Sequence, residues 1–341
     1  MSNIDTISEF LLHAGTDYRI YDMARGIRPV SSQTFLDIEN GLVPAPLPRQ
    51  QHAWFGILFF NKQASKEQYI WFVKLPLDEK GLVIPAGRQQ FLQIVVEALG
   101  QYLENENNPN NQLPENPFTF VPNQNQLADF NSICRTSLEL PPSAHFEQFK
   151  NYLEQPKEHD WKNLAIQGVA DFCATISTSD STELLINTFN DLAPEIQNAL
   201  CSSLENHEVN SKLCMQLIDW QQEKTNDLQR LAATLRGLCQ GVDKPAITSF
   251  LHQVLTSSQS EKLDILILIA ARHWSYLNDQ SILKMFIQRL ADSGSDTFVS
   301  LYSDLVQIPE IRVSMLSILR WPDKSPQLTQ AIGLLFGQES A

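Results

Sequence analysis

The sequence contains few of the residue patterns that mark an enzyme active site. It has 13 glycines in 341 residues, and none of them forms a P-loop, a G-x-G-x-x-G turn or a G-x-S-x-G nucleophile elbow. The H-E-x-x-H and C-x-x-C patterns of metal and redox sites do not occur either. We therefore expect no catalytic, cofactor-binding or metal-binding residues.

Long apolar runs and basic clusters are also missing. The most apolar stretch, residues 265–271, is much shorter than the ~20 residues that a membrane span needs. The first residues lack the basic and apolar segments of a signal peptide. No run of Lys and Arg offers a positive surface to a phosphate backbone. We expect a cytoplasmic protein that binds neither membranes nor nucleic acid.

The cysteine content favours a cytoplasmic protein, and the net charge favours a basic partner. The five cysteines are Cys134, Cys173, Cys201, Cys214 and Cys239. Their number is odd and each lies in an apolar helical pattern, which is typical of reduced thiols in a core. The formal net charge is −14 and the acidity is spread over both halves of the chain. Such a surface favours a basic partner or a basic segment of one.

A small α+β domain is predicted over residues 1–103. Residues 53–60 and 69–75 are apolar runs joined by a polar stretch, which predicts a β-hairpin. Neither run alternates apolar with polar residues, so both faces of the hairpin should be covered. A helix over 88–103 is expected to cover one face with its apolar stripe. The second cover is left open between the helix predicted over 4–14, the C-terminal half and a partner chain.

Further elements are predicted on either side of the hairpin. A strand is expected over 18–25 and a short helix over 31–41. Residues 104–117 hold six Asn and three Pro, which is typical of a linker or loop. Residues 118–156 are predicted to carry two bridging helices, near 124–139 and 143–154.

From residue 157 onward the patterns are helical throughout. The first helices of successive pairs are predicted to begin near Trp161, Pro194, Asp227, Glu261 and Asp296, and their partners near Asp180, Val209, Lys244, Asp279 and Pro309. The first helices recur every 33–35 residues, a period typical of α-solenoids. We therefore predict that residues 157–341 form a HEAT-like stack of about five helix pairs.

Four charged residues near the hairpin are the candidates for an interaction site. Asp22, Arg25, Lys74 and Asp78 are predicted to form a charged rim of the small domain. A structural role is also expected for Asp78, because Asp-Glu-Lys-Gly at 78–81 has good turn chemistry.

A second candidate lies in the helical half. Arg272, His273 and Trp274 are predicted to end a helix. A cation there is stabilised by the helix dipole, and a Trp beside an Arg also suits a binding hot spot.

The N-terminal motifs carry a family resemblance. Residues 21–25 (Tyr-Asp-Met-Ala-Arg) and the segment Trp-Phe-Val-Lys-Leu-Pro-Leu-Asp-Glu-Lys-Gly-Leu at 71–82 resemble the domain of unknown function 3549 family of gammaproteobacterial proteins. The resemblance implies a bacterial cytoplasmic protein of similar length. It implies no activity and no site residues, since no function is established for that family.

Three function hypotheses follow from these observations. The first is a non-catalytic interaction or adaptor protein that uses the helical-repeat surface, as stacked helix pairs commonly do. The second is a homo-oligomeric structural protein that pairs through an uncovered face of the hairpin. The third is an enzyme with an active site in the inter-domain cleft, built from Asp22, Arg25, Lys74 and Asp78.

Overall fold

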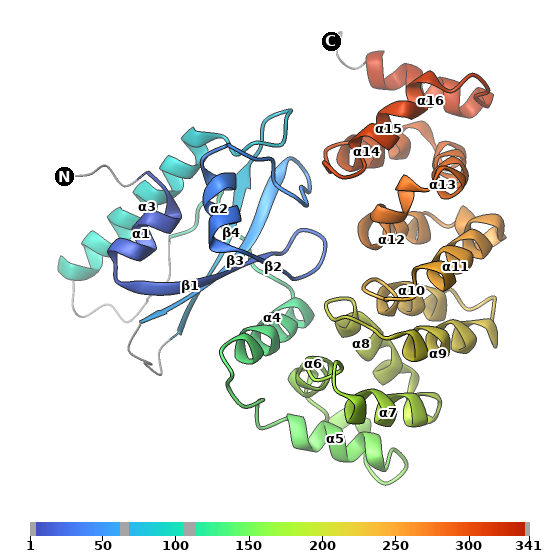
Figure 1. Cartoon of the computed structure of the whole chain (residues 1–341), viewed down its shortest axis with the longest axis horizontal. Helices are drawn as coiled ribbons and strands as arrows, with labels where there is room; N and C mark the ends of the chain where they lie inside the picture. The colour runs from blue at the N-terminus through green and yellow to red at the C-terminus, as the bar shows by residue number, and fades with distance from the viewer. Residues whose placement is uncertain (1–4, 62–67, 105–113, 338–341) are drawn as a thin grey trace. The chain divides into compact units, whose positions relative to one another are not determined.

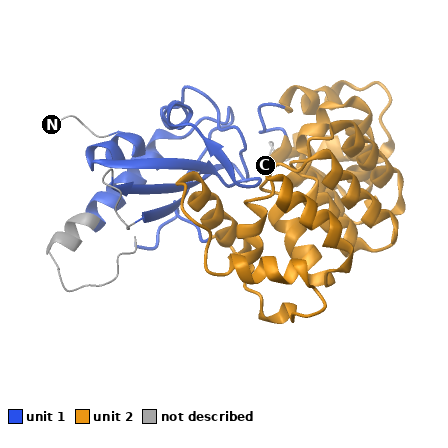
Figure 2. Ribbon diagram, turned by 60° about the horizontal axis from the view of Figure 1, so that its bottom comes forward, with its two compact units in different colours: residues 1–121, 306–310 blue, residues 122–305, 311–341 orange. Residues whose placement is uncertain are grey.

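The computed structural model divides into two compact units (Figure 2). The sheet unit comprises Met1–Val121 and Val306–Glu310, and the helical unit comprises Pro122–Leu305 and Ile311–Ala341. The structure describes residues 5–61, 68–104 and 114–337, with the backbone alone for 99–104. These residues form sixteen α-helices and one four-stranded antiparallel sheet (Figure 1). Among them, no helix combines the length and the apolar character that crossing a bilayer requires.

The sheet unit contains the predicted hairpin. Its elements are α1 (Ile7–His13), β1 (Thr16–Asp22), β2 (Arg28–Val30), α2 (Ser32–Glu39), β3 (His52–Asn61), β4 (Gln68–Pro76) and α3 (Pro85–Glu104). The strand order is β2-β1-β3-β4, and every neighbouring pair is antiparallel. The hairpin β3–β4 is confirmed, and so are the three helices predicted over 4–14, 31–41 and 88–103. The three-residue strand β2 was not predicted, since three residues with a proline among them show no periodicity.

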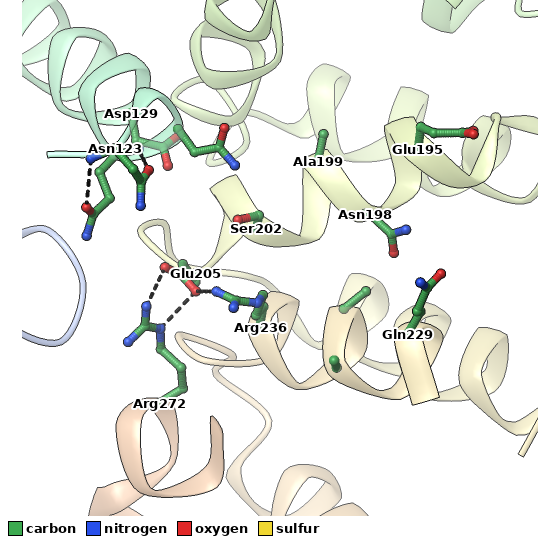
Figure 3. Close-up of a pocket in the computed structure, with 14 residues that line it drawn as sticks. Asn123, Asp129, Glu195, Asn198, Ala199, Ser202, Glu205, Gln229, Arg236 and Arg272 are labelled. Carbon is green, nitrogen blue, oxygen red and sulfur yellow. Dashed lines mark hydrogen bonds and ion pairs between the residues drawn. The ribbon is translucent and has the colours of Figure 1, made fainter. Parts of the chain in front are cut away.

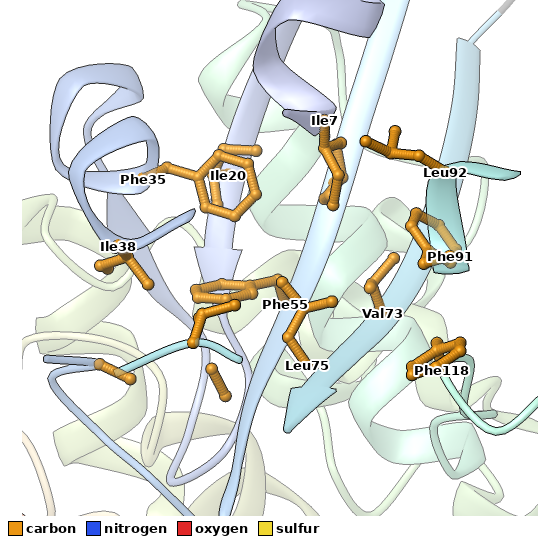
Figure 4. Close-up of a cluster of buried hydrophobic side chains, with 14 of the residues drawn as sticks. Ile7, Ile20, Phe35, Ile38, Phe55, Val73, Leu75, Phe91, Leu92 and Phe118 are labelled. Atoms are coloured by element: carbon orange, nitrogen blue, oxygen red, sulfur yellow. The ribbon is translucent and has the colours of Figure 1, made fainter. Parts of the chain in front are cut away.

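One face of the sheet is covered by α1, α2 and α3 together (Figure 4). Phe55 and Val73 are directly paired across the hairpin and point to this face. The ring of Phe35 from α2 meets Phe55 edge-on at 5.0 Å, and Phe91 of α3 and Ile7 of α1 complete the same buried cluster. The predicted cover by the third helix is therefore confirmed, and two more helices share it.

Residues 118–120 extend the same sheet at the edge of β4. The Lys74 amide donates to the Phe118 carbonyl at 2.8 Å, and the Phe120 amide donates to the Phe72 carbonyl at 3.2 Å. On the opposite face of the sheet, the Phe120 ring lies 4.8 Å from Trp54. The expected boundary at residue 103 is thus wrong, because this segment completes backbone pairing in the sheet unit. Most of the predicted linker, residues 105–113, lies outside the described residues.

A buried carboxylate fixes α1 in the sheet unit. Glu39 accepts hydrogen bonds from the backbone amides of Ile7 (2.6 Å) and Ser8 (3.2 Å) and from the Ser8 hydroxyl (2.6 Å). These amides belong to the first turn of α1, where unpaired N–H groups and the helix dipole favour an anion. The Glu39 carboxylate therefore has a structural role, which is to hold the first turn of α1.

The helical unit contains all the remaining helices. They are α4 (Gln124–Ser137), α5 (Phe146–Glu154), α6 (Ile166–Cys173), α7 (Ser179–Thr188), α8 (Pro194–Leu204), α9 (Ser211–Gln222), α10 (Leu228–Gly237), α11 (Lys244–Thr256), α12 (Leu263–Arg272), α13 (Gln280–Asp292), α14 (Ser295–Leu305), α15 (Arg312–Ser317) and α16 (Pro326–Gly337). Short 3₁₀ turns lie at Trp161–Asn163, Phe189–Asp191, Ser258–Glu261, Trp274–Asn278 and Ile318–Arg320.

These helices stack in two layers (Figure 1). In the first layer each helix contacts the next in the series α4, α6, α8, α10, α12 and α14. In the second layer the series is α5, α7, α9, α11 and α13, and α16 contacts both α13 and α14. The prediction of two bridging helices between domains is corrected, because α4 and α5 both pack on α6 and each begins one of the two layers of the stack.

Capping side chains set three of the helix starts that were predicted. The side chains of Asp227, Asp243 and Asp279 accept hydrogen bonds from the first-turn amides of α10, α11 and α13. Apolar stripes then bury one side of each helix, and all five cysteines are buried within the unit, as predicted.

Candidate functional site

The predicted charged rim is not a set of four surface residues. Asp22 ends β1 and is 1% exposed, and its Oδ1 accepts from the Ala24 amide at 2.9 Å. Burial raises the pKa of Asp22 to about 7. Arg25 is 4% exposed and donates through Nε and Nη2 to the Pro48 carbonyl, at 3.2 and 2.9 Å. These two residues hold the end of β1 and the segment 43–48, which contains three prolines; this corrects the expectation that they lie on a rim.

The other two predicted rim residues are at or near the surface. Lys74 is half-buried, and its Nζ lies 5.5 Å from the centroid of the Trp54 ring. Asp78 is exposed, and its Oδ1 accepts from the amides of Lys80 (2.9 Å) and Leu82 (2.8 Å). This geometry is the turn that the sequence predicted for Asp78. A role for either residue in binding stays a prediction.

A polar groove of about 580 Å³ lies in the helical unit (Figure 3). It is bordered by α4, α8, α10 and α12, all from the first layer. We call it the first-layer groove, and its lining residues are Asn123, Asn125, Gln126, Asp129, Glu195, Asn198, Ala199, Ser202, Glu205, Gln229, Ala232, Ala233, Arg236 and Arg272.

An ion-pair cluster forms one end of the groove. Glu205 caps the C-terminus of α8 and is 6% exposed. Its carboxylate accepts two bonds from Arg272, at 2.8 Å from Nε and 2.9 Å from Nη2, and one from Arg236 Nη1 at 3.1 Å. Both arginines lie in the last turn of their helices, where the helix dipole favours a cation. Three consecutive first-layer helices are thereby joined through one carboxylate (Figure 3).

Asp129 is a second buried carboxylate in the groove, and its environment differs. It lies on α4 and is 4% exposed. Its Oδ1 accepts from the Ser203 hydroxyl and its Oδ2 accepts from the Asn206 amide group at 2.9 Å. Burial raises the pKa of Asp129 to about 7; the Ser203 hydrogen bond opposes this rise and the charge of Glu205 adds to it.

Amides and small side chains form the middle of the groove. On α8, Glu195, Asn198 and Ser202 follow one another at helical spacing and so share a face. On α10, Gln229 and Arg236 share the corresponding face with two alanines between them. A smaller pocket of about 280 Å³ adjoins this stretch, because Asn198 and Gln229 line both.

A sequence signal for the groove existed but was weak. Asp129, Glu205, Asn198, Gln229 and Arg236 were not singled out from the sequence. Arg272 was expected to cap its helix, and it does lie at the end of α12. A search for polar residues at three- and four-residue spacing on the side opposite each apolar stripe would have found the α8 and α10 faces.

The groove presents both hydrogen-bond donors and hydrogen-bond acceptors. It offers carbonyl, carboxylate and hydroxyl acceptors together with amide and guanidinium donors. Across the described residues, no cluster of three or more His, Cys, Asp or Glu side chains has the arrangement of a metal site. All five cysteine thiols are buried away from this surface.

Fold and groove together define a two-unit protein in which a small antiparallel sheet accompanies a two-layer helical stack. The model of the family described as "Protein of unknown function (DUF3549)" matches residues 2–336, and the chain belongs to this family. Searches of curated proteins and of solved structures returned no match.

Proposed function

We propose that this chain is a non-catalytic protein–protein interaction or adaptor protein that binds an extended, basic segment of another protein in the first-layer groove. One observation carries the proposal: four helices of one layer contribute amide, hydroxyl and charged side chains to a continuous polar groove. The two-layer stacking supports the classification of the helical unit as a HEAT-like α-solenoid, a fold whose common use is binding.

The amides explain why the proposed partner is extended. An Asn or Gln side chain has one acceptor and a donor group, which match the C=O and N–H of a peptide unit. An extended segment leaves these main-chain groups unpaired, so Asn198 and Gln229 are placed to bond them regardless of sequence. The alanines between them leave room for the main chain to approach the helices.

The charges explain why the proposed partner is basic. The groove carries three carboxylates, on Asp129, Glu195 and Glu205, against the two guanidinium groups of Arg236 and Arg272. The chain as a whole has a net charge of −14. Complementary charge speeds the encounter and selects the partner, so binding should weaken as salt is raised. The same acidity argues against nucleic-acid binding, and the five buried cysteine thiols support a cytoplasmic location.

A random-peptide library displayed on phage and selected against the full-length protein tests the proposal. Enriched peptides should contain Lys or Arg and lose about tenfold or more of their affinity for an Asn198→Ala/Gln229→Ala double variant, by fluorescence anisotropy. The matched control is Gln222→Ala/Gln253→Ala, which removes two exposed amides from the second layer. This control should bind as the unchanged protein does.

Two results would contradict the proposal. One is the failure of any peptide to enrich above background at low salt. The other is equal affinity of enriched peptides for the groove variant and the unchanged protein, with circular dichroism showing both folded. The homo-oligomeric alternative is tested in the same preparation by light scattering, and a monomer at high concentration would exclude it.

A further inference from the structure

The groove contains one buried carboxylate without a cationic partner. Glu205 accepts from both arginines, and Glu195 is exposed to solvent at the edge of the groove. Asp129 is buried, and the hydrogen bonds that its carboxylate receives come from a hydroxyl and an amide group, both neutral. Within the described part of the chain, no Lys, Arg or His bonds to it.

A buried carboxylate held only by neutral donors is costly when it is ionised. Removing the charge from water is repaid only by a cation or by several strong hydrogen bonds. The ion pairs around Glu205 show what full compensation looks like, and they lie in the same groove (Figure 3). Asp129 differs because it lines the same groove and accepts from neutral donors, Ser203 and Asn206.

We propose that Asp129 is the cation-recognition residue of the groove, where its carboxylate binds the ammonium or guanidinium group of a Lys or Arg side chain. This inference rests on the proposed function, because the cation belongs to the peptide segment that lies along the groove. The surrounding helix ends support it, since the C-termini of α8, α10 and α12 converge here and each is the negative end of a helix dipole.

Cation binding at this position should release a proton. Burial first, and then the charge of Glu205, raise the pKa of Asp129 to about 7 against the hydrogen bonds from Ser203 and Asn206. Of the other titratable groups near it, Cys173 on α6 is a buried thiol whose pKa is raised, so it stays neutral. Arg236 and Arg272 are bonded to Glu205. An incoming cation favours the ionised carboxylate, so the carboxyl proton leaves to the buffer.

The test uses two versions of a groove-binding peptide from the selection, one with its Lys and one with the neutral isostere norleucine. Affinity is measured by anisotropy from about pH 6 to about pH 8. The Lys peptide should bind about tenfold tighter at the upper pH, because the ionised fraction of Asp129 rises about tenfold over this range. The norleucine peptide should show no such dependence.

Two variants separate the charge of Asp129 from its packing. Asp129→Asn should weaken the Lys peptide about thirtyfold at pH 8, remove the pH dependence and leave the norleucine peptide unchanged. Asp171→Asn is the matched control, because Asp171 on α6 is 2% exposed, accepts from the Ser132 hydroxyl and the Ser143 amide, and does not line the groove. It should bind both peptides as the unchanged protein does.

Each other outcome decides between the inference and the proposed function. Equal binding of the Lys and norleucine peptides at pH 8, or unaltered pH dependence in Asp129→Asn, overturns the inference. The proposed function still stands in that case if the peptide binds the Asn198→Ala/Gln229→Ala variant more weakly than the unchanged protein. If the selection yields no peptide, n-butylammonium chloride serves as the probe. It should lower the pKa of Asp129, followed by carboxyl ¹³C NMR, more than sodium chloride of equal ionic strength does, and an equal effect overturns the inference.

Discussion

The buried carboxylates of the sheet unit and those that line the first-layer groove are held by different kinds of donor. In the sheet unit, Glu39 accepts from two backbone amides of α1 and Asp22 accepts from the Ala24 amide. In the helical unit, Asp129 and Glu205 accept from side chains of other helices and line a groove. A carboxylate that holds backbone within one unit has a structural task. Of the two groove carboxylates, Glu205 is paired with two arginines, and Asp129 is the one that we propose binds a ligand.

Substitution of Glu39 should give the largest effect. Glu39→Ala leaves the first-turn amides of α1 buried without an acceptor, and we expect a loss of about 4 kcal/mol in the free energy of unfolding. Denaturant titration by circular dichroism measures it. Glu9→Ala is the control on the same helix: Glu9 is exposed and takes part in the capping box with Thr6, so the loss should be under about 1 kcal/mol. Similar losses for both variants would contradict the structural task assigned to Glu39.

Removal of the charge of Glu205 should have the next largest effect. Glu205→Gln leaves Arg236 and Arg272 without their shared anion, and we expect a loss of about 3 kcal/mol, read by the same denaturant titration. Glu183→Gln is the matched control, because Glu183 is exposed on α7 and its carboxylate accepts from the Ser179 hydroxyl at 3.4 Å. It should cost less than about 1 kcal/mol. If the control variant lost as much free energy of unfolding as Glu205→Gln, the role of Glu205 as the shared anion of Arg236 and Arg272 would be refuted.

Substitution of Asp129 should stabilise the chain at alkaline pH. The folded-state pKa of about 7 lies above the ordinary value near 4, so the folded chain binds more protons between these values. The free energy of unfolding therefore falls as pH rises through this window and stays low above it. Asp129→Asn avoids this cost, and we expect it to be about 2 kcal/mol more stable than the unchanged protein at pH 8.

The same variant sharpens the comparison between the units. Burial also raises the pKa of Asp22 to about 7, so the sheet unit should keep its own loss of stability with rising pH in Asp129→Asn. Thermal unfolding at several pH values separates the two: the strand signal reports on the sheet unit, and the helix signal comes mainly from α4 to α16 of the helical unit. A variant with the full pH dependence of the unchanged protein in its helical signal would show that Asp129 does not titrate as described.

The smallest effect is expected at an exposed ion pair of the helical unit. Arg289 Nη1 lies 3.6 Å from Glu261, which is 64% exposed. Such pairs contribute little in water, so Glu261→Gln should change the free energy of unfolding by less than about 0.5 kcal/mol. A larger change would mean that surface charges stabilise this unit and would weaken the contrast drawn for Glu205.

The predictable part of the fold was the part encoded by local pattern. The hairpin followed from two apolar runs, and the helix starts predicted near Asp227 and Asp279 coincide with the side chains that cap α10 and α13. The groove did not follow, because its contacts join distant residues. Ser203 meets Asp129 across 74 positions, and Arg272 meets Glu205 across 67. Whether a charged residue is buried depends on such partners, which a single helix pattern does not reveal.

The central claim is that the first-layer groove, and no surface of the sheet unit, receives the partner segment. Photo-cross-linking tests it most directly, with a selected peptide that carries a benzophenone side chain and mass-spectrometric mapping of the attached residues. The account predicts cross-links on α8 and α10 around Asn198 and Gln229, and their loss when unlabelled peptide competes. Competable cross-links confined to the sheet unit would contradict it.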